Sequence, residues 1–161
     1  MGDDLERFVT AQEPHMADVQ AELLDGRKRT HWMWFVFPQL RGLGRSEMAR
    51  RYGLASPAQA RAYLAHPVLG PRLRGCVELL LKTRDRSAHD IFGSPDDLKL
   101  RSCLTLFREV EGEDSLFAQA LERFFDGRPD PATLALLALL GGDAEEPVPK
   151  RAPSAQPASG V

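Results

Sequence analysis

The sequence predicts an all-α protein, folded as a single compact multihelical domain of about seven to eight helices. A capping residue stands before proline three times, as at the first turn of a helix; the pairs are Ser56-Pro57, Ser94-Pro95 and Asp130-Pro131. Glycines follow several apolar runs, where helices commonly end; they are Gly93, Gly112, Gly127 and Gly141. Between these marks, apolar residues recur every three or four positions, which is the helical period.

In chain order, the helical patterns cover residues 3–11, 14–25, 46–54, 57–65, 68–84, 87–92, 95–111, 115–125 and 131–140. Only WMWFVF (32–37) has a strand-like composition, and no second such run exists to pair with it. We therefore expect an extended or short helical buried segment that ends at Pro38. The helical domain spans residues 1–141. Residues 142–161 are rich in Pro, Ala and Ser and lack aromatic residues, so we expect a disordered tail.

Length and composition are those of one globular domain: 161 residues, 43% hydrophobic and 27% charged. Cys76 and Cys103 fall in apolar helical patterns without a close cysteine partner, which predicts free, buried thiols and a reducing compartment. The acidic N-terminus resembles no signal peptide, and no apolar run is long enough to span a bilayer. We expect a cytoplasmic protein without a membrane partner.

The net charge of −2 conceals an uneven distribution. Residues 1–26 carry a charge of −6, residues 27–86 a charge of +10, and residues 87–161 a charge of −6. The basic middle either pairs with the acidic ends inside the fold or presents a positive face to phosphate.

The segment 26–46, GRKRTHWMWFVFPQLRGLGRS, combines cations with both tryptophans. Guanidinium and ammonium groups bind phosphate, and an adjacent ring stacks on a nucleotide base. The other interpretation is a solvated loop followed by a core plug. We expect a split, with Trp34 in the core and His31 and Trp32 at the edge of a cleft beside Arg29. The ligand-binding candidates here are Arg27, Lys28, Arg29, His31 and Trp32. The loop 39–46 is a second candidate, because its glycines allow close backbone approach.

A third candidate lies in residues 93–107, GSPDDLKLRSCLTLF. Asp96 and Asp97 suit the first turn of a helix, where carboxylates interact favourably with the helix dipole, and this alone explains them. With Lys99 they would also form a polar pocket, in which paired carboxylates serve acid–base catalysis. Asp96 and Asp97 are thus the catalytic candidates, and Lys99 is a further ligand-binding candidate.

Several other chemistries lack support in the sequence. The four histidines have no metal-ligand spacing, so we expect no metal. No phosphate-binding loop, nucleophile elbow or cysteine–histidine signature is present, and no cofactor is implied. No basic recognition helix stands out, so we expect no sequence-specific DNA binding.

The chain resembles the bacterial family known as domain of unknown function 1810, whose members are sometimes mislabelled calpastatin. The resemblance rests on GRKRTHWMWFVFPQLRGLGRSEMARRYGL, AYLAHPVLGPRLRGCVELLL, IFGSPDDLKLRSCLTLF and DGRPDPATLALL. It implies a mainly helical single domain and no established activity. More distantly, YLAHPVLGPRL and IFGSPDDLK are similar to segments of the NADAR group, some of whose members remove ADP-ribose from nucleobases.

Two functions follow as hypotheses. In the first, the ligand-binding candidates of the segment 26–46 line one cleft with Asp96, Asp97 and Lys99. The protein binds a phosphorylated nucleotide such as ADP-ribose or NAD in this cleft and hydrolyses an N-glycosidic bond. In the second, it is a non-enzymatic binding module for an acidic protein or a nucleic-acid backbone. Cations that converge on a concavity favour the first, and cations spread over a convex face with both tryptophans buried favour the second.

Overall fold

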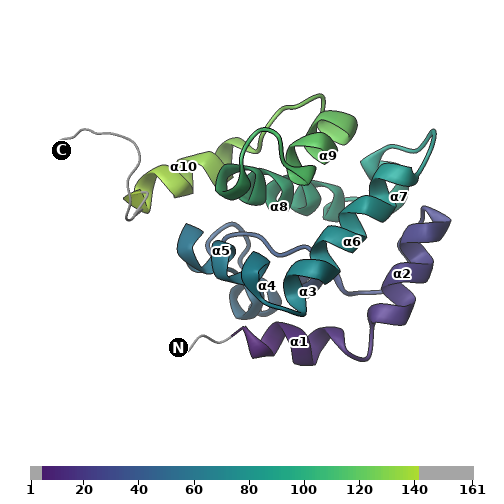
Figure 1. Ribbon diagram of the computed structural model, residues 1–161, viewed down its shortest axis with the longest axis horizontal. Helices are drawn as coiled ribbons and strands as arrows, with labels where there is room; N and C mark the ends of the chain where they lie inside the picture. Colours follow the sequence, from purple (N-terminus) through teal and green to yellow (C-terminus); the bar gives the residue numbers. More distant parts are fainter. Residues whose placement is uncertain (1–4, 142–161) are drawn as a thin grey trace.

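Helices follow one another through the whole of residues 5–141, which are the residues that the computed structural model describes (Figure 1). They are α1 (Glu6–Gln12), α2 (Met16–Asp25), α3 (Met33–Val36), α4 (Glu47–Tyr52), α5 (Pro57–Ala65), α6 (Leu69–Lys82), α7 (Ala88–Phe92), α8 (Asp96–Glu111), α9 (Leu116–Phe125) and α10 (Pro131–Leu139). No strand occurs among these residues, so the all-α prediction is confirmed. The expected seven to eight helices are slightly too few. The predicted tail, residues 142–161, lies outside the described residues.

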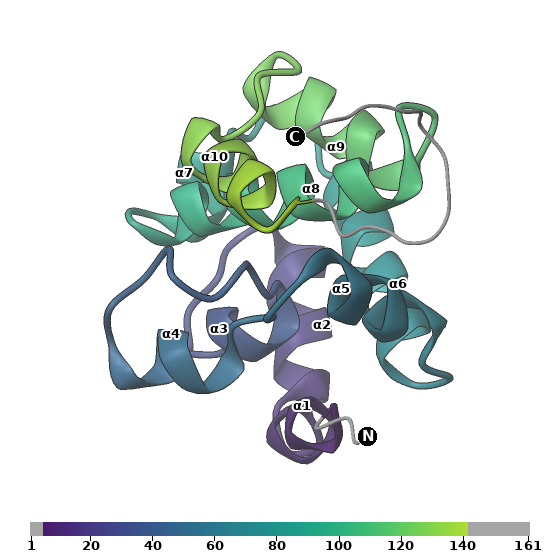
Figure 2. The ribbon, with the colours of Figure 1, turned by 90° about the vertical axis from the view of Figure 1, so that its left-hand side faces the viewer.

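Two long helices, α6 and α8, organise the packing. Helix α8 contacts α5, α7, α9 and α10, and α6 contacts α2, α5 and α9. Figures 1 and 2 show α8, α9 and α10 on one side of the molecule and α1 to α5 on the other. The start of α8 thereby comes close to the chain that follows α2, although the two segments are far apart in the sequence.

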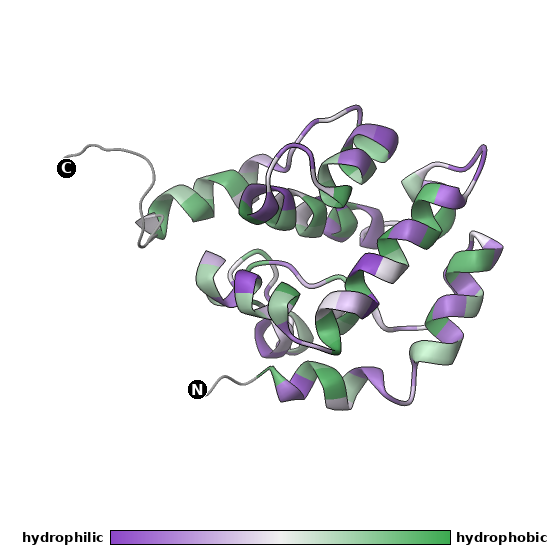
Figure 3. Cartoon of the chain, viewed as in Figure 1, coloured by the Kyte–Doolittle hydropathy of each residue, from purple (hydrophilic) through white to green (hydrophobic). Residues whose placement is uncertain are grey.

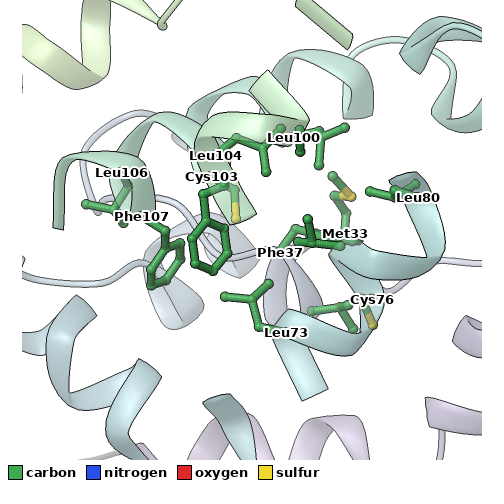
Figure 4. Close-up of a cluster of buried hydrophobic side chains, with 14 of the residues drawn as sticks. Met33, Phe37, Leu73, Cys76, Leu80, Leu100, Cys103, Leu104, Leu106 and Phe107 are labelled. Atoms are coloured by element: carbon green, nitrogen blue, oxygen red, sulfur yellow. The ribbon is translucent and has the colours of Figure 1, made fainter. Parts of the chain in front are cut away.

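The aromatic segment 32–37 enters the core between these helices. It forms the short helix α3, with Met33 and Phe37 each 1% exposed. Figure 4 shows these two side chains between apolar residues of α6, such as Leu73, and apolar residues of α8, such as Leu100 and Phe107. The expectation of a short helical buried segment is confirmed.

The predicted helix caps are confirmed at two of three proline sites. The hydroxyl of Ser56 accepts a hydrogen bond from the backbone N–H of Gln59 at 3.1 Å, and the carboxylate of Asp130 accepts one from Thr133 N–H at 3.0 Å. Ser94 makes no such bond, and α8 begins two residues after it, at Asp96. The prediction of a Ser94 cap was wrong.

Helix α10 differs from the others in being apolar all round (Figure 3). It packs on α8, while Leu139, near its end, is 82% exposed. Both predicted free cysteines, Cys76 and Cys103, are buried and unbridged, as expected.

Candidate functional site

The loop between α2 and α3 is fastened to the buried carboxylate of Glu22. One oxygen accepts hydrogen bonds from the backbone N–H groups of Arg29 and Thr30, at 2.8 and 3.2 Å, and from the indole N–H of Trp32, at 2.9 Å. The other accepts the hydroxyl of Thr30 at 2.7 Å. Burial opposes the charged form, but the hydrogen bonds outweigh it and lower the pKa of Glu22 to about 2.

Trp32 is a core residue. Its side chain is fully buried, and its ring makes edge-type contact with Phe92. The expectation that Trp32 stands at a cleft edge was therefore wrong. The reason is the carboxylate of Glu22, which gives the indole N–H a partner inside the protein and so removes the cost of burying it.

Trp34 takes the position that had been expected for Trp32. It is half-buried rather than in the core, which corrects the prediction for this residue. The ammonium of Lys99 lies 5.1 Å from the centre of its ring, within the range of a cation–π interaction.

Two lysines meet one carboxylate beside this ring. The ammonium of Lys28 is 2.9 Å from one oxygen of Asp96, and that of Lys99 is 3.5 Å from the other. Lys28 also donates to the carbonyl of Thr30 at 2.6 Å and lies 5.0 Å from the ring of Trp32. Its side chain is only 6% exposed, whereas that of Lys99 is 25% exposed. We call Lys28, Asp96 and Lys99 the lysine–aspartate cluster; it carries a net charge of +1.

A small pocket opens next to the cluster. Trp34, Gln39, Tyr52 and Lys99 line it, with the buried Met33 and Phe37 beneath. Its internal space is about 10 Å³, close to that of one water molecule. We call it the Trp34 pocket.

Three of the expected ligand-binding residues stand apart from the cluster. Arg29 is exposed and ion-paired with Asp25. Arg27 and His31 are exposed, and their side chains have no polar partner within residues 5–141. The loop thus divides its cations, with Lys28 turned inward and both arginines exposed to solvent.

Asp97 also lies apart from Lys28. Its carboxylate is 3.2 Å from the Nδ1 atom of His89 and accepts the backbone N–H of Leu98 at 2.8 Å. The two expected catalytic carboxylates, Asp96 and Asp97, therefore have separate side-chain partners.

Sequence reasoning missed three residues of the pocket: Trp34, Gln39 and Tyr52. Gln39 is the first residue of the loop 39–46, which had been singled out for its glycines. Tyr52 is the last residue of α4, and no feature of the neighbouring sequence marks it as a pocket residue.

Within the described part of the chain, no three His, Cys, Asp or Glu side chains gather closely enough to hold a metal ion. None of the helices in residues 5–141 has the length and apolar character needed to cross a membrane.

The structure therefore defines the protein as a small all-helical domain, with a lysine–aspartate cluster beside a half-buried tryptophan. The chain belongs to the family described as protein of unknown function (DUF1810), which matches residues 2–137. It is similar to the conserved hypothetical protein Rv1873 from Mycobacterium tuberculosis, whose crystal structure superposes with a TM-score of 0.82 at 52% identity, over 84% of this chain and 96% of that chain. No curated protein matches the sequence. The more distant similarity to the NADAR group stays an expectation.

Proposed function

We propose that the protein binds a phosphorylated nucleotide, such as ADP-ribose, at the lysine–aspartate cluster and the adjoining ring of Trp34. The observation that carries the proposal is the position of Lys99, whose partly exposed ammonium lies between the carboxylate of Asp96 and that ring. An ammonium group binds phosphate as a mobile point charge, and an indole ring stacks on a base.

Each member of the cluster has its own task in this proposal. Lys28 is almost fully buried and satisfied by Asp96, so it holds the carboxylate in place. Asp96 in turn positions Lys99, which contacts the phosphate. Trp34 provides the stacking surface that had been assigned to Trp32.

The distribution of cations favours a small ligand over a docking surface. Lys28 and Lys99 converge on Asp96 beside a pocket, and only one of the two tryptophans is fully buried. The exposed Arg27 favours the alternative, a module for an acidic protein or a nucleic-acid backbone.

Hydrolysis of the N-glycosidic bond is a further step of the same proposal. Asp96 would accept a proton from a water molecule that attacks the anomeric carbon and then release that proton to solvent, while the electrons of the C–N bond leave with the base. In NAD the nitrogen of this bond is cationic, so nicotinamide leaves as a neutral molecule. Both oxygens of Asp96 contact ammonium groups, so binding has the stronger support. Chromatography for nicotinamide released from NAD tests this step, and bound but intact NAD would limit the function to binding.

Titration calorimetry with ADP-ribose, NAD and AMP tests the binding proposal. We expect heat from the wild-type protein and at least about a tenfold loss of affinity in Lys99→Ala. Lys82→Ala is the matched control, because Lys82 is exposed and has no ion pair within residues 5–141; it should bind like the wild type. A folded wild-type protein that gives no heat with any of the three ligands would overturn the proposal. If it then binds an oligonucleotide or an acidic peptide at low salt, the alternative holds.

A further inference from the structure

The Trp34 pocket contains polar groups that the protein itself does not use. The side-chain amide of Gln39, the hydroxyl of Tyr52 and the indole N–H of Trp34 have no hydrogen-bond partner among residues 5–141. All three side chains are partly buried. Polar groups that are partly exposed and have no partner inside the protein can hydrogen-bond to a bound molecule.

The same residue types are hydrogen-bonded elsewhere in the core. The indole N–H of Trp32 donates to Glu22 at 2.9 Å. The amide of Gln12 donates to the carbonyl of Phe35 at 2.6 Å and lies 3.1 Å from the hydroxyl of Tyr63. A tryptophan, a glutamine and a tyrosine are thus paired with one another or with Glu22 in the core, whereas the three at the pocket are available to a molecule from outside the chain.

The backbone holds Gln39 firmly at this place. Its carbonyl accepts the N–H of Leu54 at 2.9 Å, and the N–H of Arg41 donates to the carbonyl of Leu54 at 2.8 Å. Gly44 lies against the side chain, because a Cβ atom there would be 3.5 Å from Nε2 of Gln39 and 2.7 Å from the Cβ of Ala49. A larger residue at position 44 would therefore crowd the loop that surrounds the amide.

We infer that the Trp34 pocket recognises the nucleobase of the ligand, with Gln39 as the residue that determines its identity. A carboxamide presents one donor beside one acceptor, which matches a heterocycle that has an acceptor next to an amino group, as adenine does. The aromatic face of Trp34 supplies the stacking surface. This inference rests on the proposed function only in placing the phosphate of the same ligand at Lys99.

The size of the pocket fixes how the base would lie. A space of about 10 Å³ admits no purine, so the base lies across the mouth with one edge on Gln39. The ammonium of Lys99 lies over the ring of Trp34, 5.1 Å from its centre. It must move away from this ring when the base stacks there. Binding therefore exchanges a cation–π contact for base stacking and releases Lys99 to the phosphate.

Calorimetry with three probes tests the inference: AMP, ribose 5-phosphate, and purine riboside 5′-monophosphate, which lacks the amino group. We expect AMP to bind the wild-type protein at least about tenfold more tightly than either of the others. Gln39→Leu should lose that preference and keep its affinity for ribose 5-phosphate. Gln119→Leu is the matched control, because Gln119 is exposed on α9, and it should behave as the wild type.

The outcomes separate this inference from the proposed function. Equal affinity for AMP and purine riboside 5′-monophosphate, or an unchanged preference in Gln39→Leu, would overturn the inference and leave the proposed function intact. Equal affinity for AMP and ribose 5-phosphate would overturn both the inference and the stacking on Trp34. Adenosine serves as a fourth probe. If it binds as tightly as AMP, phosphate recognition is overturned, but recognition of the base at the Trp34 pocket is supported. If none of the probes binds, the inference fails, and the proposed function fails with it only if ADP-ribose and NAD give no heat either. Should Gln39→Leu not fold, the comparison of AMP with purine riboside 5′-monophosphate on the wild-type protein decides.

Discussion

The carboxylate of Glu22 should contribute a stability that depends on pH. Its pKa is about 2 in the folded chain, against an ordinary value of 4.5. At about 1.4 kcal/mol per pH unit, this difference is worth about 3 kcal/mol. Because the folded pKa is the lower one, the contribution is complete well above pH 4.5 and is lost as the pH falls through 2. About 1 kcal/mol remains at pH 3.

The Glu22→Gln variant isolates this contribution. We expect it to reduce the free energy of unfolding by about 3 kcal/mol at pH 7, and by about 2 kcal/mol less than that at pH 3. Urea unfolding followed by circular dichroism at pH 7, 5 and 3 measures the difference from the wild type. Glu122→Gln, at an exposed position on α9, is the control and should show no such trend. A difference that stays constant from pH 7 to pH 3 would refute the assignment of these hydrogen bonds to an ionised Glu22.

Three further predictions concern burial. Trp32→Ala should lower the free energy of unfolding by about 3–5 kcal/mol in urea unfolding, and Trp34→Ala by clearly less; equal losses would mean that Trp34 is a packing residue only. In α6, Gly70→Ala should be strongly destabilising, because a Cβ would collide with a backbone carbonyl of α5. Gly75→Ala should raise the melting temperature, because nothing lies near the added Cβ and alanine favours the helix. The reverse order of melting temperatures would contradict the packing of α5 on α6. Burial raises the pKa of Cys76 to about 12, so its thiol should react with a disulfide reagent at pH 8 only after unfolding, and rapid reaction in native buffer would contradict its burial.

Local rules of the sequence predicted most of the fold because helix ends are set by near neighbours. Ser56 and Asp130 each cap a helix by accepting a hydrogen bond from the backbone N–H of the residue three positions later, as their place before proline indicates. Ser94 obeys the same spacing but does not cap α8, whose first turn is instead preceded by Pro95. The period could not decide whether 32–37 is extended or helical, because α3 has only four residues, too few to show a helical period.

The site was less predictable because its geometry depends on residues far apart in the chain. Residue type suggested that the five candidates of the loop lie in one cleft with Asp96, Asp97 and Lys99, and of these the structure joins Lys28, Asp96 and Lys99. The neighbouring sequence does not show which of the two tryptophans is fully buried. Trp32 is buried because Glu22, ten positions earlier, accepts its N–H, and Trp34 is left at the surface of the core.

Stability and binding are separable at this site. Glu22 and Lys28 fasten the loop to the core, so substitutions there alter folding together with the position of Asp96. Lys99 and Trp34 lie at the edge of the same cluster and hold little of the fold in place. A loss of ligand affinity in a Lys99 or Trp34 variant that melts like the wild type would therefore report on binding itself, and the two residues provide a test of function that the buried members of the cluster cannot.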